Sequence, residues 1–263
     1  MTRRTAIATT TAAAVAPKAS GAAAANDRPA GGFTLRPAEA RGKADFGWLR
    51  SHHSFSFGQY VDPEHMGFES LRVINDDWVQ GGGGFPPHPH KDAEIFSYVL
   101  EGALEHKDSM GNGSTVSAGG VQYMSAGSGV THSEYNPSQT TPMAFLQVWL
   151  NPTVSGAPPQ YDTLDIAPED KSGKLKLFLS PEGRDGSMSY RGDADIYAAT
   201  LDGEQSITHR MGDGARAWIQ VARGSLSVNG ESLRRGDGLA VRESGTLTFA
   251  DGEDAELIYF EFA

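Results

Sequence analysis

Two short motifs, His88-Pro-His90 and His132-Ser-Glu134, contain the residue types that bind transition metals. Side chains alternate between the two faces of a β-strand, so residues at positions i and i+2 point the same way. Two neighbouring strands would therefore direct three imidazoles and one carboxylate at a common point. This donor set suits a divalent first-row metal, and iron(II) fits it best, with manganese, nickel, cobalt and copper as alternatives. Four ligands on an octahedral ion leave two positions open, enough for a substrate oxygen and dioxygen.

The composition excludes several other kinds of site and partner. The chain has 263 residues and no cysteine, which rules out disulfides, thiolate metal sites and cysteine nucleophiles. The formal net charge is −11, and residues 45–263 carry thirty-one Asp/Glu against fifteen Lys/Arg. Such an acidic body argues against nucleic acid as a direct partner. No apolar run approaches the length of a membrane span, so no membrane partner is expected.

The first part of the chain, residues 1–32, differs in composition from the rest. It is rich in Ala and Thr and begins with a basic Arg3-Arg4 pair. This pattern indicates either an Ala/Thr-rich tail or an export signal of the twin-arginine type. We expect a cytoplasmic protein, with periplasmic export through the twin-arginine route as the alternative.

From Phe33 onward the sequence has the pattern of an all-β protein. Short runs rich in Val, Ile, Phe, Tyr and Trp alternate with glycine-containing turns, of which Asn112-Gly113 and Asn229-Gly230 are the clearest. Many short strands with such turns are typical of sandwich or barrel folds. The expected strands are Ser70–Ile74, Ile95–Leu100, Val121–Ser125, Ala144–Leu150, Leu175–Leu179, Ile196–Leu201, Ala217–Val221, Leu239–Val241, Thr246–Phe249 and Leu257–Phe262.

A weak internal repeat indicates two similar domains. Val99-Leu-Glu-Gly102 and Val221-Ala-Arg-Gly224 are each followed by further glycine turns, and the second copy has no His-x-His motif. A proline-rich segment lies between the copies. We therefore expect a metal-binding domain at residues 33–150, a linker at 151–160, and a C-terminal domain without a metal motif at 161–263.

The motifs together resemble those of the pirin family within the cupin superfamily, specifically bacterial pirins of the quercetinase type. The spacing Gly82-x5-His88-x-His90-x3-Glu94 looks like the first cupin motif, and Gly129-x2-His132-x3-Asn136 resembles the end of the second. The resemblance extends over roughly residues 33–262. Its further stretches are Gly47-Trp-Leu-Arg-Ser-His-His53, Leu71-Arg-Val-Ile-Asn-Asp77, Tyr98-Val-Leu-Glu-Gly102, Glu105-His-Lys-Asp-Ser-Met-Gly-Asn112 and His132-Ser-Glu-Tyr-Asn-Pro137.

The resemblance implies a bicupin fold: two consecutive cupin β-barrel domains with iron bound in the N-terminal one. It places the metal on His88, His90, His132 and Glu134. Several bacterial members of the family oxidise quercetin with dioxygen, and others act through protein partners. His52 departs from the family pattern, so the resemblance does not predict the surface of the neighbouring pocket.

Other titratable residues are expected to have lesser roles. Glu94 lies an even number of positions from His88 and His90, as residues on one face of a strand do, and we interpret it as a structural or ligand-orienting group. His53 either lines the pocket or is packed in the core. His65, His106 and His209 lack a partner pattern and are expected to be structural or exposed.

Two functions follow. The first is a metal-dependent dioxygenase that opens the ring of a flavonol such as quercetin, with Glu134 taking the hydroxyl proton; its partners are a small aromatic substrate and dioxygen. The alternative is a non-enzymatic, redox-responsive iron-binding regulator that acts through a protein partner, with the acidic C-terminal domain as the docking face.

Overall fold

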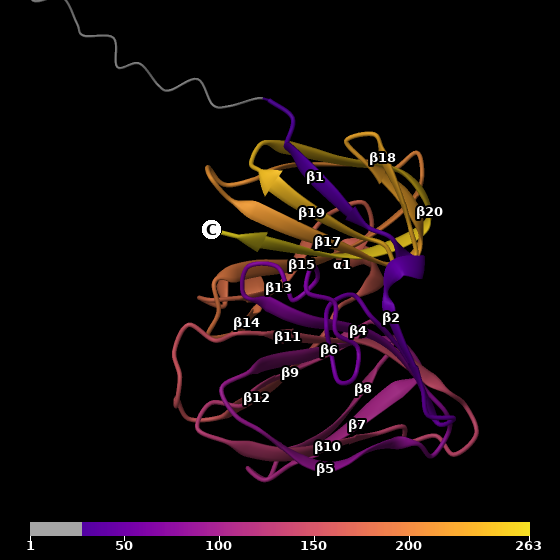
Figure 1. Cartoon of the computed structure of the whole chain (residues 1–263), viewed down its shortest axis with the longest axis vertical. Coiled ribbons are helices and arrows are strands. Elements are labelled where there is room, and N and C mark those ends of the chain that lie inside the picture. Colours follow the sequence, from indigo (N-terminus) through magenta and orange to yellow (C-terminus); the bar gives the residue numbers. More distant parts are fainter. Residues whose placement is uncertain (1–27) are drawn as a thin grey trace, which may run out of the picture.

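The computed structural model describes residues 28–263, which form two β-domains stacked on each other (Figure 1). The N-terminal half forms the lower domain in this view, and the C-terminal half forms most of the upper one. The expected all-β fold of two consecutive domains is confirmed. The question of a tail or export signal concerns residues that lie almost entirely outside the described part. Within residues 28–263, no helix has the length and apolar character needed to cross a membrane.

The N-terminal domain consists of two sheets that face each other across a common interior. The larger sheet has the strand order β12-β9-β6-β11-β4-β3-β2 and the smaller one β5-β10-β7-β8. The larger sheet consists of β2 (Gly42–Asp45), β3 (Leu49–His53), β4 (Leu71–Val79), β6 (Glu94–Glu101), β9 (Gly120–Ser125), β11 (Met143–Leu150) and β12 (Gln160–Asp165). The smaller sheet consists of β5 (Gly84–His90), β7 (Ala103–Asp108), β8 (Gly113–Ser117) and β10 (Val130–Tyr135).

The C-terminal domain is built on one nine-stranded sheet, organised around the long strands β17 and β20. Register shifts along their pairing, between Val221 and Ser227, bend the sheet. Its strands are β1 (Gly31–Arg36), β13 (Lys176–Ser180), β14 (Met188–Ser189), β15 (Ala194–Gly203), β16 (Ile207–Arg210), β17 (Arg216–Val228), β18 (Glu231–Arg234), β19 (Gly238–Glu243) and β20 (Thr246–Phe262). The helical turns are η1 (Ala38–Ala40), α1 (Pro168–Lys171) and η2 (Arg184–Gly186).

The ten predicted strands all coincide with strands of the structure, although Thr246–Phe249 and Leu257–Phe262 are two parts of the single strand β20. The tight turn at Asn229-Gly230 is confirmed, with φ angles of 48° and 86°. The prediction of a turn centred on Asn112-Gly113 is wrong. There the chain turns earlier, because the Asp108 carboxylate accepts hydrogen bonds from the backbone of Met110 and Asn112, and Gly113 already begins β8.

Strand pairing crosses the expected domain boundaries at both ends of the N-terminal domain. β1 leaves that domain and pairs with β19 of the C-terminal sheet. β12, which begins at the end of the expected linker, pairs with β9 and so extends the N-terminal sheet. Each exchanged strand covers a sheet edge that would otherwise leave backbone groups unpaired.

One hydrophobic cluster is shared by the two domains. The largest buried cluster contains Phe96 and Tyr98 of the N-terminal domain together with Phe178 and Phe260 of the C-terminal domain. A buried polar group lies at the same junction, where the ammonium of Lys171 is 2.5 Å from Glu256 and 2.6 Å from the Tyr98 hydroxyl. The metal-binding motifs therefore belong to a domain whose outer face is packed against the second domain.

Candidate metal centre

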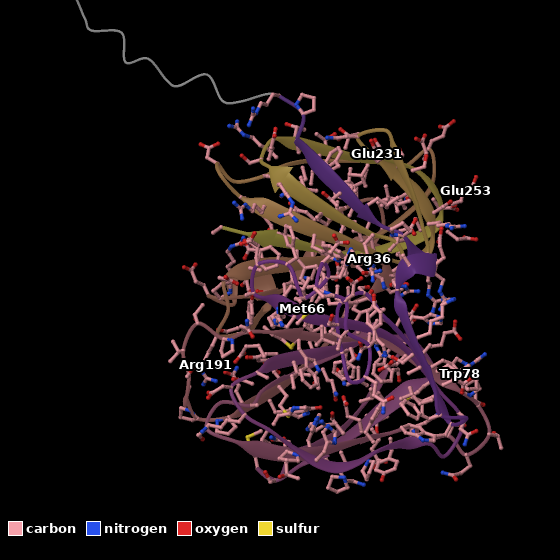
Figure 2. The ribbon with its side chains drawn as sticks, in the orientation of Figure 1. Arg36, Met66, Trp78, Arg191, Glu231 and Glu253 are labelled. Atoms are coloured by element: carbon pink, nitrogen blue, oxygen red, sulfur yellow. The ribbon has the colours of Figure 1, made fainter. Side chains whose placement is uncertain are left out.

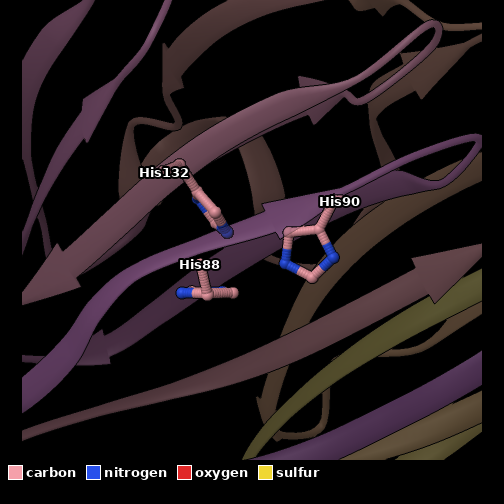
Figure 3. A group of neighbouring side chains, drawn as sticks. All are labelled: His88, His90 and His132. Atoms are coloured by element: carbon pink, nitrogen blue, oxygen red, sulfur yellow. The ribbon is translucent and has the colours of Figure 1, made fainter.

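Three imidazoles converge on the inner face of the smaller N-terminal sheet (Figure 3). His88 and His90 lie on β5, and His132 lies on the adjacent β10, directly opposite His88 in the antiparallel register. The ring centroids are 4.5 Å apart for His88 and His132, 4.8 Å for His88 and His90, and 4.9 Å for His90 and His132. One nitrogen of each ring lies within 4.8 Å of the others. The strand periodicity expected from the sequence thus brings the three histidines together.

Hydrogen bonding and burial leave these imidazoles suited to a metal. The Nδ1–H of His88 donates to the carbonyl oxygen of Pro86 at 2.8 Å, which leaves the lone pair of Nε2 free to bind a metal. Both ring nitrogens of the buried His132 lack a partner among residues 28–263. Burial and the neighbouring imidazoles lower the pKa of His132 to about 2 and that of His90 to about 4. Neutral imidazole is the form that binds metal, so the site is ready for a divalent cation.

Glu134 lies on the same face of β10 but contacts the opposite sheet. Its Oε1 accepts hydrogen bonds from the Ser97 hydroxyl at 3.0 Å and from the Gln122 amide, and its Oε2 accepts one from the Gln147 amide at 2.7 Å. Glu134 is almost fully buried, and this burial raises its pKa, although the three donors partly offset the effect. A carboxylate oxygen of Glu134 lies within 4.8 Å of a ring nitrogen of His132 and of a ring nitrogen of His106. It does not belong to the corresponding group of His88, His90 and His132.

His106 is the residue of the centre that the sequence analysis missed. It lies on β7, directly opposite Glu134 on β10, and its side chain is completely buried. Burial lowers its pKa. The sequence does contain a signal for this position, because His106-Lys-Asp108 has the same i, i+2 arrangement as the two recognised motifs.

Glu94 and His53 lie outside this cluster. The buried Glu94 carboxylate accepts hydrogen bonds from Tyr123, from Ser125 at 2.6 Å, and from the backbone N–H of Arg191 at 3.3 Å. Arg191, labelled in Figure 2, follows β14 of the C-terminal sheet, so Glu94 joins the two domains rather than orienting a ligand imidazole. His53 is packed in the core, with Nδ1 2.7 Å from the Asn75 side-chain oxygen.

The surroundings of the centre combine aromatic side chains with an opening to solvent. The Trp149 ring lies against His90 at a centroid distance of 4.8 Å, and Phe57 packs edge-on against Trp149 at 5.5 Å. A groove of about 430 Å³, lined by His90, Lys91 and Thr131 among others, reaches the outer side of His90. The half-buried His88 and His90 are thus the accessible members of the centre, whereas His132 and Glu134 are enclosed.

Comparisons with known proteins agree with this architecture. The sequence profile of Pirin matches residues 34–150, and that of the quercetinase C-terminal cupin domain matches residues 177–262. The chain is 46% identical to a quercetin 2,3-dioxygenase of Escherichia coli K12 over 228 residues, which cover 86% of this chain and 97% of that protein. It is 39% identical over 229 residues to a pirin-like protein of Caulobacter vibrioides, covering 87% and 98% of the two chains.

Two solved structures are especially similar. The crystal structure of YhhW from Escherichia coli superposes with a TM-score of 0.84 at 43% identity, covering 88% of this chain and 97% of that chain. A second structure of that bacterial pirin, in complex with nickel(II), gives a TM-score of 0.83 at 43% identity, with coverages of 88% and 98%. A quercetin 2,3-dioxygenase of Acinetobacter baumannii, 20% identical with a TM-score of 0.70, shares the fold.

Proposed function

Because the chain belongs to the pirin family, we propose that it is a metal-dependent dioxygenase that opens the ring of a flavonol such as quercetin. The observation that carries the proposal is the convergence of His88, His90 and His132 beside the Trp149 ring, with His88 and His90 partly exposed to solvent. The similarity to quercetin 2,3-dioxygenases over nearly their full length supports the same reaction. The co-substrates are a small aromatic molecule and dioxygen.

In this proposal His88, His90, His132 and Glu134 hold the metal. Two observations support ligation. Neither ring nitrogen of His132 has a hydrogen-bond partner among the described residues, and the hydrogen bond from Nδ1 of His88 to Pro86 leaves the lone pair of Nε2 available for a metal. Iron(II) is our preferred ion, and the nickel(II) complex of the related YhhW makes nickel the first alternative. When bound, such an ion supplies Lewis-acid stabilisation of a deprotonated substrate hydroxyl.

Glu134 is the proposed proton acceptor. Burial raises the pKa of its carboxyl, which favours uptake of a proton from a substrate hydroxyl, and Ser97, Gln122 and Gln147 fix the position of the carboxylate. The partly buried Trp149, which packs against the buried Ile95 and Met124, offers a surface for a flat aromatic ring.

The direct test is turnover of quercetin by protein that has been stripped of metal and reloaded anaerobically with iron(II) or nickel(II). We expect oxygen uptake and carbon monoxide release in proportion to bound metal. Stoichiometric metal binding without turnover of any flavonol would contradict the dioxygenase proposal and favour the redox-responsive regulator that binds a protein partner.

We place the protein in the cytoplasm. Identification of the N-terminal residue of the protein purified from its native cells tests this placement. An intact Met1 or Thr2 supports it, whereas a chain that starts near Asn26 would indicate cleavage after export.

A further inference from the structure

His106 belongs to a second group of potential ligand atoms that overlaps the first. One nitrogen of His106, one of His132 and one carboxylate oxygen of Glu134 all lie within 4.8 Å of one another. The group shares His132 with the cluster of His88 and His90 but extends in the opposite direction across the smaller sheet, from β10 to β7.

The hydrogen bonding of His106 is that of a metal ligand. Its Nε2 lies 3.2 Å from Oδ2 of Asp108, and a carboxylate can only accept, so Nε2 carries the hydrogen. Asp108 is itself fixed by hydrogen bonds from Asn112 and from the Met110 backbone. A carboxylate that orients a histidine in this way leaves the second ring nitrogen free to bind a metal. His88 has the same arrangement, with the carbonyl oxygen of Pro86 in place of the carboxylate.

The free nitrogen of His106 has no other use in the part of the chain that the structure describes. His106 is 0% exposed, and its Nδ1 lacks any hydrogen-bond partner among those residues. The Tyr161 ring stacks on the imidazole at a centroid distance of 4.2 Å and so contacts its face rather than its nitrogen atoms. A buried lone pair without a partner is unfavourable unless a ligand satisfies it.

The two groups differ in their access to solvent. His106, His132 and Glu134 are 0%, 2% and 1% exposed, whereas His88 and His90 are partly exposed. A position defined by the first three residues is therefore enclosed, whereas a position defined by His88, His90 and His132 has two partly exposed imidazoles.

We propose that His106 is a fifth metal-ligating side chain, and that the centre offers a divalent ion two positions. The outer position is the proposed one of His88, His90, His132 and Glu134, and the inner position uses His106, His132 and Glu134. Because the inner position lacks the two partly exposed imidazoles, an ion held there is farther from solvent than an ion held at the outer position. The inference rests on the proposed metal site but does not depend on the proposed reaction.

The test removes the outer position and asks whether metal binding persists. Nickel(II) affinity is measured by equilibrium dialysis for the wild type, for H88Q/H90Q, and for H88Q/H90Q/H106Q. We expect the double variant to bind one equivalent of nickel(II) more weakly than the wild type. Adding H106Q should lower the affinity by a further factor of at least about ten, the scale on which loss of even an outer-shell partner acts. His65→Gln in the double-variant background is the matched control, because His65 also pairs with an aspartate, Asp62 at 2.9 Å, but far from the centre along the chain.

A second readout does not require His106 to be replaced. Pulsed electron paramagnetic resonance of copper(II)-loaded H88Q/H90Q counts the coordinated imidazoles. The inner position predicts two, from His106 and His132, whereas a centre without it predicts one. Failure of the double variant to bind either ion, equal affinities with and without H106Q, or a single imidazole would overturn the proposal. None of these results depends on whether quercetin is turned over, so a failure here is distinct from a failure of the proposed reaction.

Discussion

Among single residues, Glu134 has the environment on which the proposed chemistry depends most. Three donors from three different strands of the facing sheet surround its carboxylate, and His132 and His106 lie beside it. A carboxylate with so many protein partners can exchange a metal bond for a hydrogen bond without being left unpaired in a buried site. This arrangement suits a group that both binds metal and takes up a proton.

Replacing Glu134 with Gln should separate these two roles. We expect E134Q to retain most of its metal, because the three imidazoles of His88, His90 and His132 remain, but to lose about 100-fold or more in turnover, the usual contribution of a general base. Metal content measured by mass spectrometry and oxygen uptake measured on the same sample test this prediction. Full turnover in E134Q would remove the proton-accepting role.

Asp77 gives a prediction for the metal-free protein. Burial, together with the charges of Asp76 and Glu134, raises the pKa of Asp77 to about 7 despite a hydrogen bond from Ser51. Since the folded pKa lies above the unfolded value, the native state binds the extra proton between about pH 4 and pH 7, and stability falls as the pH rises through that range.

The variant D77N should not show this fall in stability with rising pH, which is on the order of a few kcal/mol at most in the wild type. In urea unfolding of metal-free protein, we expect D77N to be more stable relative to the wild type at pH 8 than at pH 5. A stability difference that is equal at the two pH values would show that Asp77 does not titrate in this range.

At the level of elements, the centre is an assembly of neighbouring strands in register. His88 and His132 are opposite each other in β5 and β10, and Glu134 and His106 are opposite each other in β10 and β7. A register shift between His132 and Glu134 marks a bulge at the centre itself. Any change that separates β5 from β10 should therefore weaken metal binding without removing a ligand.

Gly84 provides that change. A side-chain carbon at Gly84 would lie 2.5 Å from the Glu134 carbonyl oxygen and 2.7 Å from the Tyr135 Cα atom, so G84A must push β5 away from β10. We expect nickel(II) affinity to fall at least about tenfold, as for other changes that misplace ligands. Gly113 on β8 is the control, because an added carbon there meets nothing closer than 3.7 Å, and G113A should bind nickel(II) like the wild type. Unchanged affinity in G84A would mean that the pairing of β5 and β10 does not position the ligands.

The sequence predicted the central strands and the convergence of the histidines because both depend on a period of two residues. For His106 the sequence holds only the weak signal of the His106-Lys-Asp108 pair, because Glu134, the residue that makes His106 a candidate ligand, is brought opposite by strand pairing across 28 positions of sequence. The exchange of β1 and β12 was missed for the same reason. Edge strands are assigned by which sheet they complete, and their own sequences carry little of that information.

At the scale of the whole molecule, the two domains form one structural unit. Phe96, Tyr98, Phe178 and Phe260 lie in a single buried cluster, and the exchanged strand β1 joins the first described residues to the C-terminal sheet. The domain without a metal motif therefore supports the metal-binding domain through a shared core rather than through a linker.

Truncation of Phe178 tests this unity. Phe178 is fully buried, with its ring centroid 5.4 Å from that of Phe96 and 6.1 Å from that of Tyr98. We expect F178A to lower the free energy of unfolding by about 3–5 kcal/mol, as for other buried aromatic truncations, while unfolding stays a single transition. Tryptophan fluorescence and far-ultraviolet circular dichroism should report the same midpoint. Two separate transitions would show that the domains are independent.

The most direct test of the central claim, that this metal centre catalyses dioxygenation, uses isotopically labelled dioxygen. Iron(II)-reloaded protein is incubated with quercetin under ¹⁸O₂, and the product is analysed by mass spectrometry beside that of His88→Ala treated in the same way. We predict a ring-opened product that carries both labelled oxygen atoms, with release of carbon monoxide, and no product above background with H88A. Absence of labelled product from fully metal-loaded protein, or equal labelling with H88A, would contradict the account.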